Sequence, residues 1–237
     1  MLAMIILSTI AGIDALGGTL AGVPALPRTL EFFITHGHLD HVLGLPRFAP
    51  CYHPDFTLRF HSGRDTLPAV RDAVNTLFAA PLWPVRVRGL AARIHFVEAP
   101  ERWEHDGFTI THAPLHHPGG ATGYRVTGPG ASAVLVTDYE HPAEGHPPEL
   151  VALCHQATHL IYDAHWTPEE YPKFAGWGHS TWEQAVSLAR AAQAKRIWLY
   201  HHRPERTDAA LDALVARAQT VFPACDAARE GLVLPLA

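Results

Sequence analysis

Cysteine is scarce in this chain of 237 residues. The three cysteines, Cys51, Cys154 and Cys225, are odd in number and widely spaced, and no Cys-x-x-Cys occurs. This pattern argues against a disulfide scaffold and fits buried thiols in a reducing compartment. We therefore expect a cytoplasmic protein.

Long apolar runs are missing as well. Residues 1–13 resemble the core of a signal peptide, but no basic residue precedes the run and it is too short to span a bilayer. We expect a buried strand in this segment and no membrane partner.

The chain also lacks any stretch of lysine and arginine, and its formal net charge is −5. Phosphate binding by nucleic-acid binders draws mainly on basic patches. No general nucleic-acid binding is therefore expected. Small phosphorylated substrates stay open, because metal ions can hold them.

No repeat, low-complexity linker or block of charge divides the sequence. A hydrophobic fraction of 48% and a charged fraction of 17% are typical of a globular protein and not of a disordered one. The length is ample for a buried core. We predict a single domain over residues 1–237.

Histidine is abundant, at 18 residues, and three histidines lie with an aspartate in Thr35-His-Gly-His-Leu-Asp-His41. Residues 30–35 read as a buried strand. If the extended backbone continues, His36 and His38 point to one side and can share an ion, while Gly37 permits a tight path. Asp40 and His41 can reach a second ion beside the first. A polar loop with scattered histidines is the alternative, and four donors at this spacing disfavour it.

The rest of the chain alternates between strand-like and helix-like segments. Strands are predicted at 57–61, 93–99, 108–113, 123–127, 133–137, 159–162 and 196–200, and helices at 66–79, 149–154, 181–194 and 208–221. Ser180 or Thr181 is the expected N-cap of the third helix. Sheet-rich stretches punctuated by helices predict an α/β architecture with two central sheets.

Three further candidate ligands, His117, Asp138 and His201, each follow an apolar run. Taken singly, each is more often a turn, cap or loop residue; their company with the first cluster favours a metal site. His36, His38 and His117 would hold one ion, Asp40, His41 and His201 the other, and Asp138 would bridge them. A hydroxide shared by two such cations is a nucleophile. We predict a hydrolase with two divalent ions, zinc first, with manganese and iron as alternatives.

The order His-x-His-x-Asp-His, His-Pro-Gly-Gly, Thr-Asp and a late His resembles that of the metallo-β-lactamase-fold hydrolases over essentially the whole chain. This resemblance implies a four-layer αββα sandwich with two metals at the sheet edges. It favours His117 over His116, because Pro-Gly-Gly follows residue 117. It likewise favours His201 over His202, although the strand pattern alone leaves both open.

Gly178-His-Ser-Thr181 and Trp198-Leu-Tyr-His-His-Arg-Pro204 resemble the branch of ribonuclease Z and the cyclic phosphodiesterases. The resemblance implies that His179, oriented by Asp163, contacts the phosphate and protonates the leaving oxygen. Asp40 is counted as a catalytic residue as well as a ligand. For His179, a helix-terminal residue with local hydrogen bonds is the alternative.

The residues favour some activities of related enzymes over others. Many zinc β-lactamases have a cysteine at the position of Asp138, so antibiotic hydrolysis is disfavoured. Thioester hydrolases similar to glyoxalase II usually lack Gly-His-Ser-Thr, so thioester hydrolysis is the second choice. Ribonuclease Z enzymes have a long arm between the third histidine and the bridging aspartate. Here 20 residues separate His117 from Asp138, which favours a small or cyclic phosphodiester.

The beginning of the chain departs from the family. Related enzymes have a longer N-terminal sheet and an Asp-x-Gly-Thr-Gly turn, whereas Ser8 stands here in place of that Asp. We therefore expect the fold to be shortened at the N-terminus. A truncated paralogue that binds metal without turnover is a further alternative, and an exposed sheet edge favours a homodimer.

Overall fold

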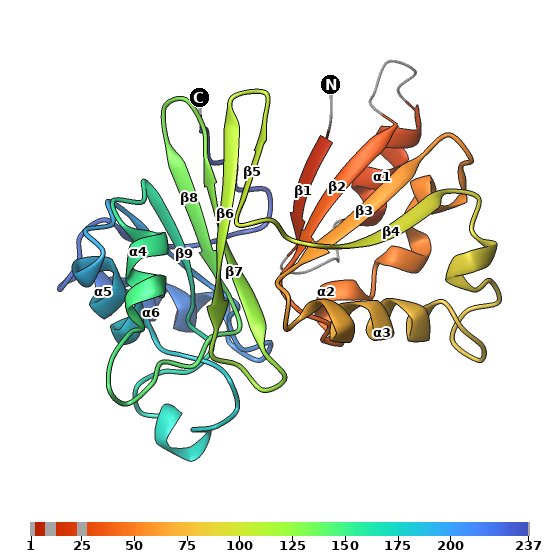
Figure 1. The fold of residues 1–237 in the computed structure, drawn as a ribbon. Coiled ribbons are helices and arrows are strands. Elements are labelled where there is room, and N and C mark those ends of the chain that lie inside the picture. The colour runs from red at the N-terminus through yellow and green to blue at the C-terminus, as the bar shows by residue number, and fades with distance from the viewer. Residues whose placement is uncertain (1–2, 8–12, 23–27, 237) are drawn as a thin grey trace. The chain divides into compact units, whose positions relative to one another are not determined.

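The computed structural model describes residues 3–7, 13–22 and 28–236. The chain divides into two compact units, Met1–Pro100 and Glu101–Ala237, and each contains one β-sheet and the helices that pack on it (Figure 1). This division does not test the prediction of one domain over residues 1–237, which stays a prediction.

In the described part of the first unit, the sheet has four parallel strands. They are arranged in sequence order: β1 (Ala3–Leu7), β2 (Thr29–Ile34), β3 (Thr57–Ser62) and β4 (Arg93–Glu98). Successive side chains of a strand point to opposite faces. Phe32 and Phe60 accordingly enter the helix-covered core. Because parallel strands need crossover connections, their carboxyl ends meet at one edge.

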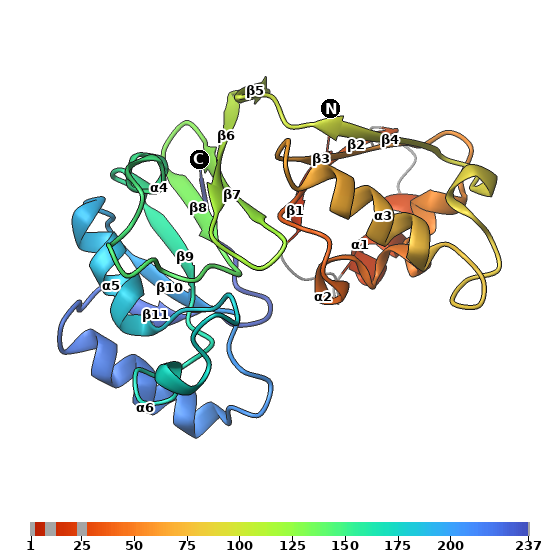
Figure 2. The same cartoon turned by 60° about the horizontal axis from the view of Figure 1, so that its bottom comes forward.

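Two helices supply the other half of this core, α1 (Ile13–Gly22) and α3 (Leu67–Leu77), and both lie on the same side of the sheet (Figure 2). Val70, Val74 and Leu77 recur at helical spacing on the buried side of α3. A short helix, α2 (Leu39–Val42), and the 3-10 turns η1 (Leu45–Arg47), η2 (Ala49–Tyr52) and η3 (Val87–Gly89) complete the unit.

The sheet of the second unit has seven strands in the order β11-β10-β9-β8-β7-β6-β5. Strands β5 (Arg102–His105), β6 (Phe108–Leu115), β7 (Ala121–Thr127) and β8 (Ser132–Val136) are antiparallel, and β9 (His159–Asp163), β10 (Ile197–Tyr200) and β11 (Cys225–Ala227) continue in parallel from β8. The carboxyl ends of β8, β9 and β10 therefore lie side by side, where open sheets place their ligands.

Three helices connect the parallel strands and cover this sheet: α4 (Pro148–Cys154), α5 (Trp182–Ala191) and α6 (Asp208–Gln219) (Figure 1). A 3-10 turn, η4 (Tyr171–Lys173), lies between β9 and α5. Thr181 is the N-cap of α5, and its hydroxyl accepts a hydrogen bond from the Gln184 amide. This agrees with one of the two predicted caps.

The predicted strands and helices occur within a few residues of their expected bounds. Helix α1, strands β5 and β11 and the short 3-10 turns were not predicted. Helix α1 contains Gly17, where an added Cβ would meet the ring of Phe48 at 2.7 Å, so glycine at this position serves packing at the expense of helix propensity. Strand β1 spans Ala3–Leu7, and the rest of the predicted strand up to residue 12, with Ser8, lies outside the described residues.

The three cysteines are free and buried, as predicted. Burial raises the pKa of each thiol to about 12, which makes these groups poor nucleophiles. Within the described ranges, no helix is both long enough and apolar enough to cross a membrane.

A buried contact between a carboxylate and a histidine lies in the sheet of the first unit. Glu31 of β2 and His61 of β3 are 2% and 5% exposed, and their Oε2 and Nε2 atoms are 2.5 Å apart. Arg59 donates a hydrogen bond of 3.1 Å to the same carboxylate. Burial alone would raise the pKa of Glu31, but the hydrogen bonds and charges of His61 and Arg59 outweigh it and lower the pKa.

Replacing Glu31 with Gln should lower the free energy of unfolding near neutral pH by about 1–3 kcal/mol, because a buried charge-assisted pair is lost. The contribution of Glu31 is fully present above its ordinary pKa of about 4.3 and is lost as the pH falls through its lower folded value. Denaturant unfolding at several pH values should therefore show the difference shrinking on acidification. Glu98→Gln, at an exposed pair with Arg64, is the control. A difference that stays constant with pH would contradict this account.

Candidate metal centre

The first unit presents its donors directly after β2. His36 and His41 are buried, His38 and Asp40 are exposed, and the ring centroid of His36 lies 4.5 Å from that of His38 and 4.1 Å from that of His41. The Asp40 carboxylate is 3.1 Å from Nε2 of His41. The predicted four-donor cluster is therefore compact.

The buried hydroxyl of Thr35 lies 3.2 Å from Nδ1 of both His36 and His41. A hydroxyl can donate to one imidazole and accept from the other, so Thr35 fixes both rings. Such outer partners orient metal-ligating histidines. From the sequence, Thr35 was expected only as the end of the strand, and this contact was not predicted.

Gly37 lets the donor loop pack directly on α3. A Cβ at this position would meet the carbonyl oxygen of Ala69 at 2.7 Å. Any larger residue would have to move the loop or the first turn of the helix. The tight path expected from glycine therefore has a packing cause as well as a conformational one.

In the second unit, His117 follows β6 and is buried, whereas His116 is exposed. Nδ1 of His117 donates a 2.8 Å hydrogen bond to the carbonyl of Gly178. Since a carbonyl only accepts, the proton is on Nδ1 and the lone pair is on Nε2, the arrangement of a metal ligand. His116 instead bonds the carbonyl of Glu140 through Nδ1, at 3.1 Å.

Asp138 and His201 follow the carboxyl ends of β8 and β10, and both have left-handed backbones, with φ of 53° and 54°. Such values are uncommon outside glycine and gather at functional sites. Oδ1 of Asp138 lies 3.4 Å from Nε2 of His201, while its Oδ2 accepts a 2.7 Å bond from the hydroxyl of Thr137.

His202 has a different environment from His201. Both of its ring nitrogens are buried, and burial lowers its pKa. The structure therefore brings His201, and not its neighbour, to Asp138.

Asp163 ends β9 and is completely buried. Its Oδ2 accepts a 2.8 Å hydrogen bond from Nδ1 of His179, and its Oδ1 accepts bonds from the amides of His165 and Ser180, at 3.0 and 3.1 Å. The predicted His179–Asp163 pair is thus formed. With Nδ1 bound to the carboxylate, Nε2 is the ring nitrogen of His179 that can act on a substrate.

His165 lies within the same group of rings as His179 and His201. Its ring stacks on that of His179, with centroids 4.4 Å apart and planes at 20°. Nδ1 of His165 donates to the carbonyl of His201 at 2.9 Å. Donor atoms of His165, His179 and His201 all lie within 4.8 Å of one another.

Glu140 is a second residue whose role was not predicted from the sequence. Its carboxylate accepts hydrogen bonds from the hydroxyl of Tyr171 and from the amides of Gly176 and Gly178, at 2.9, 2.6 and 2.8 Å. Burial would raise the pKa of Glu140, but these bonds outweigh burial and lower it. Glu140 therefore holds the loop whose Gly178 carbonyl orients His117. The only sequence signal was its place two residues after Asp138.

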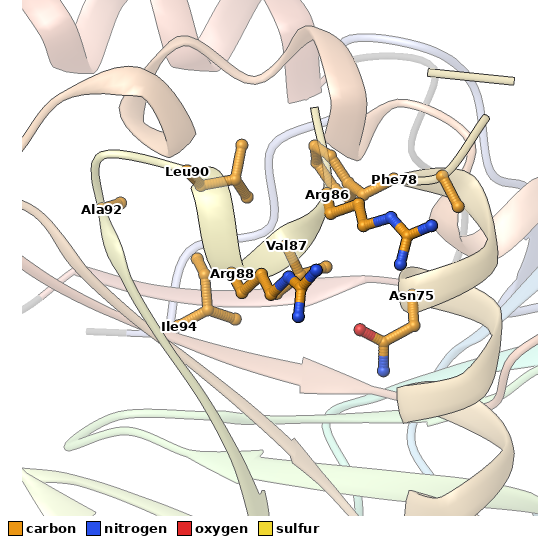
Figure 3. A pocket seen from close by; sticks show the side chains of 9 residues that line it. Asn75, Phe78, Arg86, Val87, Arg88, Leu90, Ala92 and Ile94 are labelled. Atoms are coloured by element: carbon orange, nitrogen blue, oxygen red, sulfur yellow. The ribbon is translucent and has the colours of Figure 1, made fainter. Parts of the chain in front are cut away.

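A hollow of about 630 Å³ in the first unit does not include the donors of the His36–His41 loop (Figure 3). It lies beside the end of α3 and the start of β4, whereas the His36–His41 loop follows the carboxyl end of β2. Exposed Arg86 and Arg88 line it, and no histidine, cysteine or carboxylate does. It is therefore no metal site.

The donor groups suit divalent metal ions. Neutral imidazoles with fixed tautomers, accompanied by carboxylates, are ligands of zinc, manganese and iron. Each unit holds one group: His36, His38, Asp40 and His41 in the first, and His117, Asp138 and His201 in the second. That the two groups share ions stays a prediction.

Fold and donors together define the class of this protein as a metal-dependent hydrolase. A model of the beta-lactamase superfamily domain matches residues 12–202. The chain therefore belongs to this superfamily.

Two curated relatives extend over most of the chain. It is 24% identical to ribonuclease BN of Cronobacter sakazakii, over 89% of this chain and 83% of the relative. It is 26% identical to ribonuclease Z of a Cyanothece species, over 89% and 80%.

Solved structures show the same fold at low identity. The metallo-β-lactamase-fold protein YhfI of Bacillus subtilis matches with a TM-score of 0.67 at 18% identity, over 96% of this chain and 84% of YhfI. The short form of human tRNase Z matches with a TM-score of 0.61 at 16% identity, over 88% and 80%. The predicted metallo-β-lactamase fold and the resemblance to ribonuclease Z are confirmed.

One prediction is wrong. The exclusion of general nucleic-acid binding is contradicted, because the similar proteins include several named as ribonucleases. The argument from a net charge of −5 summed the whole chain. Cleavage of a phosphodiester requires only that the phosphate beside the scissile bond be held, and metal ions can do this without a basic patch.

Gly178 yields a test of the second donor group. It has a φ of 87°, and a Cβ there would clash with the imidazole of His117 and with Pro118. Gly178→Ala should therefore displace His117 and reduce bound metal, measured by plasma mass spectrometry on the purified protein.

The matched control is Gly145→Ala. Gly145 has a φ of 101°, but nothing lies within 4 Å of the place that a Cβ would take, so only the backbone cost of a positive φ applies, about 1–2 kcal/mol. Equal metal content in both variants would show that the contact between Gly178 and His117 does not support metal binding.

Proposed function

We propose that this protein is a phosphodiesterase with two divalent metal ions, zinc first, and that its substrate is a small or cyclic phosphodiester. The observation that carries the proposal is the pair of His179 and Asp163, joined at 2.8 Å within the ring group that contains His201. Such a pair is suited to proton donation beside a phosphate.

The proposed metal ligands are His36, His38, Asp40, His41, His117, Asp138 and His201. When bound, divalent ions supply Lewis acidity, neutralise phosphate charge and provide a nucleophile from water at neutral pH. Asp138 accepts a bond from Thr137 on one oxygen and faces His201 with the other. This leaves its carboxylate oriented by the protein before any substrate arrives.

The role proposed for His179 is that of general acid. Attack on phosphorus breaks the bond to the leaving oxygen, which must take up a proton as it departs. The imidazolium form of His179 carries that proton on Nε2, while Asp163 holds Nδ1–H and compensates the charge. General acid catalysis of this kind typically contributes about 10²–10⁴-fold in rate.

The short connection between His117 and Asp138 supports a small substrate. It consists of β7, a tight turn at 128–131 and β8, with β7 and β8 paired as a hairpin. RNA is the second candidate, and the names of the curated ribonuclease relatives favour it. Thioester hydrolysis and metal binding without turnover stay alternatives.

The division of roles predicts different effects for two histidine variants. His179→Ala should lower kcat for bis(p-nitrophenyl) phosphate about 10²–10⁴-fold and leave metal content intact, because it removes a proton donor. His38→Ala should reduce metal content itself. His155→Ala, an exposed histidine outside the donor groups, is the control. Equal metal loss in the first two variants would show that His179 is a ligand and not the acid.

Substrate size is tested by comparing a 2′,3′-cyclic nucleotide with a short RNA. We expect a higher kcat/KM for the cyclic nucleotide, since no arm is present in the hairpin segment to hold a long chain. Hydrolysis of the RNA alone would replace the first candidate by the second. Hydrolysis of a glutathione thioester without hydrolysis of any phosphodiester would refute both.

A further inference from the structure

Trp177 stands out on the surface of the second unit. It is 63% exposed, although Trp is among the side chains with most apolar area to bury. A single exposed apolar side chain needs no explanation on an ordinary surface. This one lies two residues before His179, next to the proposed reaction site.

The Trp177 ring is supported from below by other aromatic rings. It meets Phe174 edge to face, with centroids 5.4 Å apart, and Trp166 likewise at 6.4 Å. Trp166 and Phe174 stack on each other at 4.0 Å with planes at 4°. No parallel ring lies on Trp177 among the residues that the structure describes. The aromatic cluster therefore fixes Trp177 and leaves it room for a stacking partner.

The backbone on both sides of Trp177 is fixed as well. The amides of Gly176 and Gly178 both donate to the carboxylate of Glu140, at 2.6 and 2.8 Å, and the Trp177 amide donates to the carbonyl of Phe174 at 3.1 Å. A side chain held in this way loses little conformational entropy when a ligand binds. Its exposure is thus a property of a rigid loop.

The loop of Trp177 is tied to the acid–base pair. Gly178 joins it to His179 in sequence and to His117 through the Gly178 carbonyl. Consecutive Cα atoms lie about 3.8 Å apart, so the backbones of Trp177 and His179 are within about 7–8 Å. A group attached to a phosphate beside His179 is therefore within reach of an indole ring.

We propose that Trp177 is a stacking platform for a nucleobase carried by the phosphodiester substrate. This inference rests on the proposed function and narrows it to nucleotide diesters, as opposed to sugar phosphodiesters without a base. Every nucleobase has a π-face, and stacking on an aromatic side chain is worth about 1–3 kcal/mol per base. Trp177 would act in binding and take no part in proton transfer.

The test is a binding measurement on the metal-containing protein as purified. Calorimetry should show that the wild type binds adenosine 5′-monophosphate more tightly than ribose 5-phosphate, which has the same phosphate and sugar but no base. Trp177→Ala should weaken binding of the nucleotide about 5–150-fold, the factor that corresponds to the stacking energy. It should leave ribose 5-phosphate unchanged.

Two further variants separate stacking from general effects. Trp177→Phe keeps a π-face and should retain most of the preference for the nucleotide. Leu82→Ala removes another exposed apolar side chain, 60% exposed in the first unit, and should change neither constant. Equal binding of both ligands by the wild type, or an unchanged nucleotide constant in Trp177→Ala, would overturn the proposal.

A third ligand, a five-nucleotide oligoadenylate, distinguishes whether the stacked base belongs to RNA or to a free nucleotide. Tighter binding of the oligomer than of the monophosphate, with the same loss in Trp177→Ala, assigns the platform to RNA; equal binding assigns it to free nucleotides. These constants do not depend on turnover. Absence of bis(p-nitrophenyl) phosphate hydrolysis would refute the proposed function while leaving a measured base preference in place.

Discussion

The buried carboxylate of Asp163 is the constraint on which the second unit's site depends. A completely buried charge is stable only if hydrogen bonds satisfy it, and here the bonds come from the His179 ring and the amides of His165 and Ser180. Meeting that demand fixes both ends of the loop between β9 and α5. The Ser180 hydroxyl also forms hydrogen bonds with Nδ1 of His141 and with the hydroxyl of Tyr162, at 2.7 and 3.1 Å.

A second carboxylate, that of Glu140, also binds the loop between β9 and α5. Glu140 holds the middle of the same loop through two backbone amides, and the loop in turn supplies the carbonyl that sets the tautomer of His117. Rigid support of this kind matters for catalysis, because misplacement by about 1 Å can cost about 100-fold in rate. The buried polar contacts of this loop therefore orient His117 and His179.

Sequence alone could predict most of the elements and where the candidate donors stand in the chain, because both depend on local patterns. The His36–His41 spacing and the apolar runs before His117, Asp138 and His201 are readable in that way. The roles of Thr35 and Glu140 could not be predicted from the sequence, since they depend on contacts that form only in the folded chain. Helix α1 was not predicted because Gly17 lowers the helix propensity of this segment; glycine is present there because a side chain would clash with the ring of Phe48. The prediction that the protein does not bind nucleic acids was wrong because net charge sums over the whole chain and says nothing about a single site.

In the proposed function, the donor groups bind divalent metal and the metal is needed to cleave phosphodiesters. The most direct measurement is hydrolysis of bis(p-nitrophenyl) phosphate by protein that has been stripped with a chelator and then titrated with zinc or manganese. Stripping should abolish activity, and recovery should saturate near two equivalents of metal per chain. Full activity in protein shown by mass spectrometry to be metal-free would contradict the proposed function.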